Sequence, residues 1–139
     1  HTHPFVSVYE AYKKSGPNVL GVEALQGDDG CTGVKVNTAD GYADYLFTAT
    51  DMQAHHPSKR VSFCGRLGLI REKEGQIQLM YLGCGRSLKK GNFVLESDHD
   101  VYAAIYMQHG VWYYSATGPV RVKIGKETKE LNEGYNQKL

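Results

Sequence analysis

Apolar and polar residues alternate in short runs along most of the chain, and turn residues separate these runs. Alternation with a period of two is typical of β-strands that bury one face. The runs recur about every 8–12 residues, which is typical of an antiparallel sandwich or barrel, and helical periodicity is nearly absent. We therefore expect an all-β fold, a two-layer antiparallel β-sandwich of about ten strands, in which residues 1–139 form a single domain. The expected strands are Phe5–Tyr12, Val19–Leu25, Thr32–Asn37, Tyr42–Ala49, Val61–Arg71, Gln76–Gly83, Asn92–Glu96, Val101–Met107, Val111–Ser115 and Val120–Ile124.

The longest expected hairpin lies within residues 61–91. Its loop Lys73-Glu74-Gly75 has three residues and ends in Gly, which predicts a type I turn closed by a G1 bulge. In the resulting register Cys64 faces Cys84 across the ladder. Because both faces of the hairpin are largely apolar, we expect it at the centre of the fold. One face is predicted to hold Phe63, Leu67, Leu69, Ile77, Leu79 and Tyr81, and the other Cys64, Arg66, Ile70, Met80, Leu82 and Cys84.

The three cysteines, Cys31, Cys64 and Cys84, are an odd number, so at least one thiol is unpaired within the chain. Directly opposed strand positions often impose poor disulfide geometry. Two buried thiols at Cys64 and Cys84 are therefore the preferred interpretation, and a disulfide is the alternative. No Cys-x-x-Cys or Cys/His pair has the spacing of zinc ligands, and we expect neither a metal nor a cofactor.

Composition narrows the functional classes. The 139 residues suffice for one domain with its own core. The 16 basic and 15 acidic side chains are scattered and give a net charge of +1, so we expect no binding to nucleic acid. No run of about 18 apolar residues occurs, so we expect no membrane span. Ten Tyr stand against four Phe and one Trp, a composition that suits both sheet surfaces and platforms for sugar stacking.

The chain opens with His1 and runs almost directly into a strand-like segment, so we expect it to be a piece of a longer polypeptide. Three segments, taken in order, resemble the C-terminal β-sandwich region of heparinase II/III-like polysaccharide lyases. The segments are Phe5–Tyr12, Val34–Phe47 with its Asp40-Gly41 turn, and Phe63–Gly85. The specificity comes from the series and not from any single segment.

The resemblance implies a parent enzyme in which an α/α-toroid catalytic domain precedes this region. Such an enzyme cleaves uronic-acid-containing polysaccharides by β-elimination. The resemblance implies a non-catalytic segment that packs on the upstream catalytic domain and is periplasmic or secreted. It also makes an anionic polysaccharide a candidate partner. We transfer no catalytic residue to this segment, because those groups belong mainly to the toroid and to the preceding sheet region.

Four residues are candidates for substrate binding. Arg66 and Arg86 flank the central hairpin, and a guanidinium offers a planar fork to a carboxylate or a sulfate. Trp112 and Tyr114 lie on the same side of one strand, where they can form a stacking platform. The simpler interpretation is structural: arginines that pair with internal acids, and aromatic side chains that pack in the core.

The histidines offer weaker candidates. His1-Thr2-His3 with Glu10 resembles a cupin metal motif only in part, because the carboxylate lies at the wrong spacing. Asp98-His99-Asp100 places neighbouring side chains on opposite sides of an extended chain, and a turn explains it better. His55 to Arg60 predicts an exposed loop. Two alternatives to the lyase domain stay open: an independent carbohydrate-binding module, and a small metal-binding β-barrel enzyme built on the histidines.

Overall fold

The computed structural model describes residues 8, 10, 16, 18–25, 27–28 and 30–139. Within these residues all regular elements are β-strands, and paired strands run antiparallel, which confirms the predicted all-β class. Among these described residues, the structure contains no helix that is long and apolar enough to cross a membrane. The strands are β1 (Val19–Leu25), β2 (Cys31–Thr38), β3 (Tyr42–Ala49), β4 (Val61–Lys73), β5 (Gln76–Lys90), β6 (Phe93–Gln108), β7 (Val111–Ala116), β8 (Val120–Ile124), β9 (Glu127–Leu131) and β10 (Gly134–Lys138).

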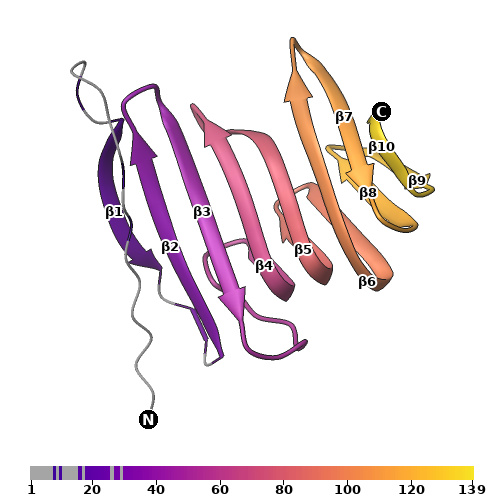
Figure 1. Cartoon of the computed structure of the whole chain (residues 1–139), viewed down its shortest axis with the longest axis horizontal. Helices are drawn as coiled ribbons and strands as arrows, with labels where there is room; N and C mark the ends of the chain where they lie inside the picture. Colours follow the sequence, from indigo (N-terminus) through magenta and orange to yellow (C-terminus); the bar gives the residue numbers. More distant parts are fainter. Residues whose placement is uncertain (1–7, 9, 11–15, 17, 26, 29) are drawn as a thin grey trace.

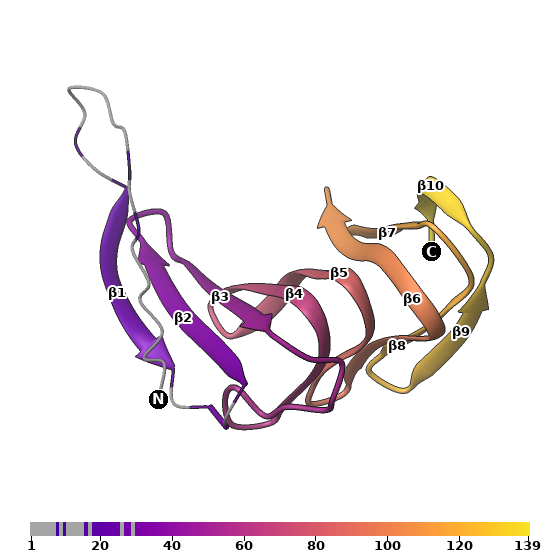
Figure 2. The same cartoon turned by 60° about the horizontal axis from the view of Figure 1, so that its bottom comes forward.

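All ten strands belong to one hydrogen-bonded sheet, in the order β1-β2-β3-β4-β5-β6-β7-β10 (Figure 1). β8 and β9 leave this path, because β8 pairs with β6 and β9 pairs with β8. The two halves of β6 therefore have different partners: residues 103–108 pair with β7, and residues 93–96 pair with β8. Figure 2 shows β1–β3 on one side of β4 and β5, and β6, β7 and β10 on the other. One open sheet thus supplies both sides of the core.

The sheet bends where its central strands carry bulges. The β4–β5 register shifts between Cys64 and Gly65, and the β5–β6 register shifts on both sides of Gly85. Cys84 has a φ of 49°, in the left-handed region. Between the pairs Gly85↔Val101 and Ser87↔Glu96, β6 has the longer stretch of chain. Because bulges bend strands and increase their twist, the two halves of β4, β5 and β6 turn toward each other.

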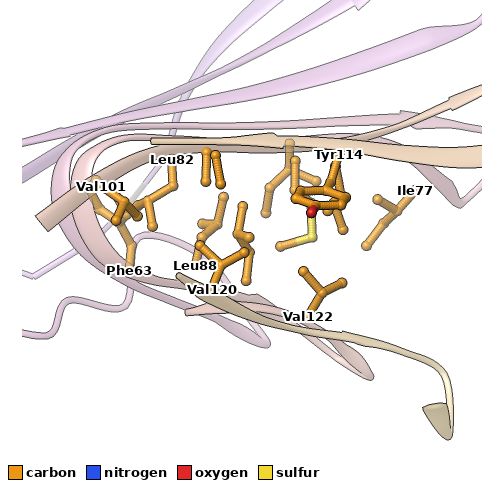
Figure 3. Close-up of a cluster of buried hydrophobic side chains, with 14 of the residues drawn as sticks. Phe63, Ile77, Leu82, Leu88, Val101, Tyr114, Val120 and Val122 are labelled. Atoms are coloured by element: carbon orange, nitrogen blue, oxygen red, sulfur yellow. The ribbon is translucent and has the colours of Figure 1, made fainter. Parts of the chain in front are cut away.

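The hydrophobic core lies inside this bend (Figure 3). Leu82 and Tyr114 point into it from one part of the sheet, and Leu88 and Val120 point into it from another. Burying one such aliphatic side chain contributes roughly 1.5–3 kcal/mol. The largest fully buried side chains are Phe47, Phe63, Ile70, Met80, Leu82, Leu88, Leu95 and Ile105.

The β4–β5 hairpin is central, as expected, but its predicted turn is wrong. Lys73 pairs with Gln76, which leaves the two-residue loop Glu74-Gly75 with φ values of 53° and 77°. Positive φ at both loop residues is the mark of a type I′ turn, whose twist matches that of the flanking strands. This loop is one residue shorter than expected.

The predicted register is wrong for the same reason. The shorter loop moves the pairing by one residue, and bulges near Arg71 and Gly65 move it further. Cys64 therefore faces Ser87 and not Cys84. Cys31, Cys64 and Cys84 are all free thiols.

The bulges also redistribute the hairpin side chains between the two faces. Phe63 and Ile77 lie on the core side together with Ile70, Met80 and Leu82. Leu67 and Tyr81 lie on the opposite side, where both approach Gly83. The predicted grouping assumed unbroken alternation, and each bulge reverses that alternation.

The other strands match the expectation with few changes. β1, β3 and β8 have the predicted bounds. The expected strands Asn92–Glu96 and Val101–Met107 are parts of the single long strand β6, and the polar tail forms β9 and β10. Of the expected strand Phe5–Tyr12 only Val8 and Glu10 are described, neither within a strand; the remainder lies outside the described residues.

A substitution at Gly85 tests whether the bend depends on the close approach of β4 and β5. A Cβ at this position would lie 2.5 Å from Leu82 Cδ1 and 2.8 Å from both the Cys64 carbonyl oxygen and Gly65 Cα. Backbone atoms of β4 cannot retreat without opening the hairpin, so we predict that Gly85→Ala lowers the unfolding free energy by about 1–3 kcal/mol. Urea denaturation of the purified chain measures this change.

The matched control is Gly21→Ala, because a Cβ on Gly21 meets nothing within 4 Å. This substitution should change the unfolding free energy by less than about 0.5 kcal/mol. Equal effects of the two substitutions would contradict the close approach of β4 and β5.

Candidate functional site

The sheet face opposite the core carries most of the described tyrosines. Cross-strand pairing aligns side chains in rows on this face. One row runs Leu46, Leu69, Tyr81, Ala104 and Ser115 across β3 to β7. We call this side of the sheet the tyrosine face; it holds Tyr42, Tyr81, Tyr102, Tyr106, Tyr113 and Tyr135, whereas Tyr45 and Tyr114 pack against the core.

A groove of about 460 Å³ lies on the tyrosine face over β5, β6, β7 and the start of β10. Ala104 and Ser115 are cross-strand neighbours, and their small side chains leave the floor low. Tyr81 adjoins Ala104 on the β5 side. Tyr102 and Tyr135 also line the groove, with 54% and 77% of their surface exposed. We call this the tyrosine groove; its rim also includes Thr117, Glu133 and Gly134.

Hydrogen bonds to Asn136 hold the β10 side of the groove. The Asn136 backbone N–H donates to Ser115 Oγ at 2.9 Å, and the Tyr106 hydroxyl donates to Asn136 Oδ1. Asn136 has a φ of 50°, a conformation that Asn tolerates better than most residues. The β7–β10 register shifts between Gly134 and Gln137. Tyr135 therefore sits within an irregular part of β10, next to a residue that is tied to β6 and β7.

The other two tyrosines of the groove also have defined supports. The Tyr81 ring lies beside Gly83, where an added Cβ would be 3.0 Å from Tyr81 Cε1. Tyr102 exchanges two hydrogen bonds with Thr117, each 3.0 Å long: the Tyr102 N–H donates to Thr117 Oγ1, and the Thr117 N–H donates to the Tyr102 carbonyl. Hydrogen bonds thus hold the backbone of Tyr102 and the strand beside Tyr135, and the Tyr81 ring packs next to Gly83.

A paired arginine lies elsewhere on the same face, near the β4–β5 turn. Arg71 donates to Asp44 through Nε at 2.7 Å and through Nη2 at 2.8 Å. This hydrogen bonding raises the pKa of Arg71 above its ordinary value. The ring of Tyr42 lies 4.8 Å from Arg71 Cζ and 5.0 Å from Lys73 Nζ. Both the charge of Arg71 and the ring of Tyr42 are therefore already engaged.

The predicted arginines Arg66 and Arg86 are exposed on the outside of the bend. Arg66 Nη1 donates to the Thr50 carbonyl at 2.8 Å. Arg86 Nε donates to Asp100 Oδ1 at 2.9 Å, and this hydrogen bond raises the pKa of Arg86. Both contacts are of the structural kind, and substrate binding by these two side chains stays a prediction.

The predicted aromatic pair Trp112 and Tyr114 points to the core. Tyr114 is 8% exposed, and its hydroxyl donates to the Asn132 carbonyl at 3.1 Å. Trp112 is half-buried against Phe93, with ring centroids 5.9 Å apart. The two rings do share one side of β7, but packing occupies that side; their binding of substrate stays a prediction. The sequence did not single out Tyr81, Tyr102 and Tyr135, because they come from three separate strands.

His55 is buried, contrary to the expected exposed loop. It is 4% exposed and lies between two carboxylates, with Nδ1 2.6 Å from Asp28 Oδ1 and Nε2 2.7 Å from Asp51 Oδ1. Its backbone pairs with Phe63. The loop folds inward because Asp28 and Asp51 replace water at both ring nitrogens. In the part of the chain that the structure describes, no group of three or more His, Cys, Asp or Glu side chains is arranged to hold a metal ion.

The three groups shift one another's pKa. The hydrogen bond to Asp51 raises the pKa of His55, burial opposes it, and Asp28 raises it further. The Gln53 backbone N–H and His55 lower the pKa of Asp51. Partial desolvation acts to raise the pKa of Asp28, but hydrogen bonds from the His55 ring and the His56 backbone outweigh it. Carboxylate oxygens only accept hydrogen bonds, so both contacts are hydrogen bonds at the same time when both ring nitrogens of His55 carry a proton.

This cluster predicts a pH dependence of stability. Because the pKa of His55 is raised on folding, its contribution is complete below the ordinary value of 6.5 and is lost as the pH rises through the raised value. The lowered pKa values of Asp28 and Asp51 give a contribution that is present above 3.8 and lost at lower pH. The cluster should therefore stabilise the fold most between these two values.

The measurement is the Tm of the wild-type chain and of His55→Gln at about pH 5.5 and about pH 8.5. The Tm difference should be larger at the lower pH. His109→Gln is the control, because His109 is exposed in the β6–β7 turn. A His55→Gln effect that is the same at both pH values would contradict the ion-pair description.

Known proteins match this chain over most of its strands. The family model of the endo-acting ulvan lyase C-terminal domain matches residues 19–107, from β1 to near the end of β6. An endo-acting ulvan lyase of Formosa agariphila is 33% identical over 101 residues, which cover 68% of this chain and 12% of that enzyme. This chain thus spans a small part of the length of that relative. No solved structure matches it. Together these matches show that the chain belongs to the family of endo-acting ulvan lyase C-terminal domains, the C-terminal domains of a class of polysaccharide lyase.

Proposed function

We propose that this chain is a non-catalytic C-terminal domain of an ulvan-degrading polysaccharide lyase, and that it packs on the catalytic part of that enzyme. Family membership supports a lyase parent with further chain upstream. One observation carries the non-catalytic role: Arg71, Arg86, Arg121 and His55, which are suited to elimination chemistry, are engaged in internal contacts. β-Elimination next to a carboxylate requires a group that neutralises this carboxylate and a base that removes the adjacent proton.

Three of the five described arginines have internal acidic partners. Arg71 pairs with Asp44, and Arg86 pairs with Asp100. Arg121 contacts two carboxylates, at 3.0 Å from Glu96 and 2.9 Å from Glu130. A substrate carboxylate would have to displace these partners, which makes each arginine a poor neutralising group.

His55, two of the thiols and Glu10 are also unsuited to act as a base or a nucleophile. Both ring nitrogens of His55 are bonded, and its side chain is buried. Burial raises the pKa of the Cys31 thiol to about 11, and it raises the pKa of Cys64 as well. Such thiols are protonated at neutral pH and are weak nucleophiles. Glu10 accepts hydrogen bonds from the backbone N–H groups of Asn18 and Val19, so its carboxylate is occupied too.

An aliphatic patch at the β1 end of the sheet supports packing on the rest of the enzyme. β1 is the first strand in the order, and its Leu20 and Val22 are 69% and 48% exposed. A hollow of about 290 Å³ lies next to β1 on the tyrosine face. Exposed aliphatic side chains on an edge strand usually mark an interface. The hollow is lined by Val8, Thr32, Gly33, Val34, Val36, Leu46, Thr48 and Leu67.

Two finer statements and two alternatives stay predictions. A heparinase II/III-like parent is supported by the three-segment resemblance. A periplasmic or secreted location is supported by the polymeric nature of the substrate, which an enzyme inside the cell does not meet intact. The metal-binding β-barrel alternative is built on the histidines, of which His1 and His3 lie outside the described residues. The carbohydrate-binding alternative has a specific observation in its favour, the tyrosine groove.

Activity assays test the non-catalytic role. The purified 139-residue chain should release no unsaturated product from ulvan, whereas the parent enzyme should release it, as followed by ultraviolet absorbance. The physical reason is that Arg71, Arg86, Arg121 and His55 are internally paired. Release of unsaturated product by the chain alone would contradict the proposal.

A substitution in the aliphatic patch tests the packing. In the parent enzyme, Leu20→Asp should lower the Tm or separate one unfolding transition into two, because it places a charge in the interface. In the 139-residue chain the same substitution should leave the Tm nearly unchanged, because Leu20 is 69% exposed there. Thr128→Asp, on the exposed strand β9, is the matched control and should affect neither protein. Equal effects of Leu20→Asp in both proteins, or no effect in the parent, would contradict the packing.

A further inference from the structure

We propose that the tyrosine groove binds a segment of a sugar chain by stacking the rings of Tyr81, Tyr102 and Tyr135 on the sugars, without charge pairing. The choice of ulvan as the sugar chain to test first rests on the proposed function. The mode of binding rests on the groove alone. The site is separate from the predicted residues Arg66, Arg86, Trp112 and Tyr114, none of which lines it.

The shape of the groove suits a ligand of several rings. Its volume of about 460 Å³ lies in the roughly 300–1,000 Å³ range of ligand sites. The floor is low because Ala104 and Ser115 have small side chains and face each other across β6 and β7. The rings stand around this floor on β5, β6 and β10, so they surround a common space.

Tyrosine rings suit sugars for an electrostatic reason. An aromatic ring has a negative face, and the C–H bonds on one side of a pyranose carry a small positive charge. The phenol hydroxyl stays in water or bonds to sugar hydroxyls. Tyr102 and Tyr135 are large exposed aromatic side chains beside one groove, a grouping that usually marks a binding surface.

The polar groups of the groove favour hydroxyls over anions. Glu133 lies at the rim and can accept hydrogen bonds from sugar hydroxyls, as can the hydroxyls of Ser115 and Thr117. Among the described residues that line the groove, none is a lysine or an arginine. Anionic substituents must therefore point away from the groove and from Glu133. Binding by this site should accordingly depend little on salt.

The groove is held in place before any ligand arrives. Thr117 exchanges two hydrogen bonds with Tyr102, and Asn136 ties the strand that carries Tyr135 to Ser115 and Tyr106. A backbone that is already ordered loses less conformational entropy on binding. Stacking without charge pairs provides little binding energy, so a site that is already formed favours binding by this mode.

The chemistry of the groove distinguishes it from the aliphatic patch on the same face. The patch offers Val and Leu side chains around a hollow, the pattern expected at a protein interface. The groove offers tyrosine rings, small residues and hydroxyls. We therefore assign the patch to protein packing and the groove to the sugar chain.

Calorimetric titration of the 139-residue chain tests the proposal, with oligosaccharides of ulvan, alginate and a neutral glucan as probes. Tyr102→Ala and Tyr135→Ala should each weaken binding at least about tenfold, the usual loss when a central aromatic side chain is truncated. Tyr102→Phe should bind like the wild type, because the ring and not the hydroxyl makes the contact. Arg86→Ala should also bind like the wild type. Raising the salt from about 50 to about 500 mM should change the affinity little, since no charge pair forms.

Several outcomes would overturn the proposal. These are the absence of saturable binding to every probe, binding that high salt and Arg86→Ala abolish, or binding that the tyrosine substitutions leave intact. A lower Tm of the parent enzyme carrying Tyr135→Ala would also overturn it, because that result places the groove at a protein interface. Binding of alginate or glucan but not of ulvan, with the expected tyrosine dependence, would support the groove and count against the proposed substrate.

Discussion

The close contact between the backbones of β4 and β5 at Gly65 and Gly85 is the constraint on which the rest of the structure depends. A Cβ on Gly65 would lie 3.0 Å from the Cα of Gly85, and a Cβ on Gly85 would lie 2.8 Å from the Cα of Gly65. Without side chains at this point, the two strands bend together and enclose Phe63 and Leu82. One sheet then closes its own core, so its opposite face does not have to cover a second sheet. That face is free to carry a hollow, a groove and exposed tyrosines.

The sequence predicted the parts of the fold that depend on local patterns. Alternation and turn residues placed β1, β3 and β8 correctly and identified the β4–β5 hairpin as central. Counting along the hairpin failed because bulges have no reliable sequence signal, and each bulge reverses the alternation of faces. The type I′ loop Glu74-Gly75 added another residue of error. The pairing of Cys64 with Cys84 depended on both assumptions.

The candidate site was harder to predict than the fold. Tyr81, Tyr102 and Tyr135 become neighbours only when the strand order β5-β6-β7-β10 is known, and the tail that carries Tyr135 is polar and short. Trp112 and Tyr114 were predicted to form a stacking platform because they are close in sequence. The same alternation that places them on one side of the strand also directs them to the core. His55 was expected in water because its loop is polar. Its partners are the carboxylates of Asp28, which is distant in sequence, and of Asp51, which lies in the same loop region.

We propose a division of one face of the sheet into an aliphatic end that packs on the enzyme and an aromatic end that holds a sugar chain. The most direct measurement of this division is a set of amide NMR spectra of the 139-residue chain, recorded during titration with ulvan oligosaccharides. We expect shift changes confined to residues around Tyr81, Tyr102, Ala104, Ser115 and Tyr135. Shift changes centred on Arg66 and Arg86, or on Leu20 and Val22 at the aliphatic end, would contradict it.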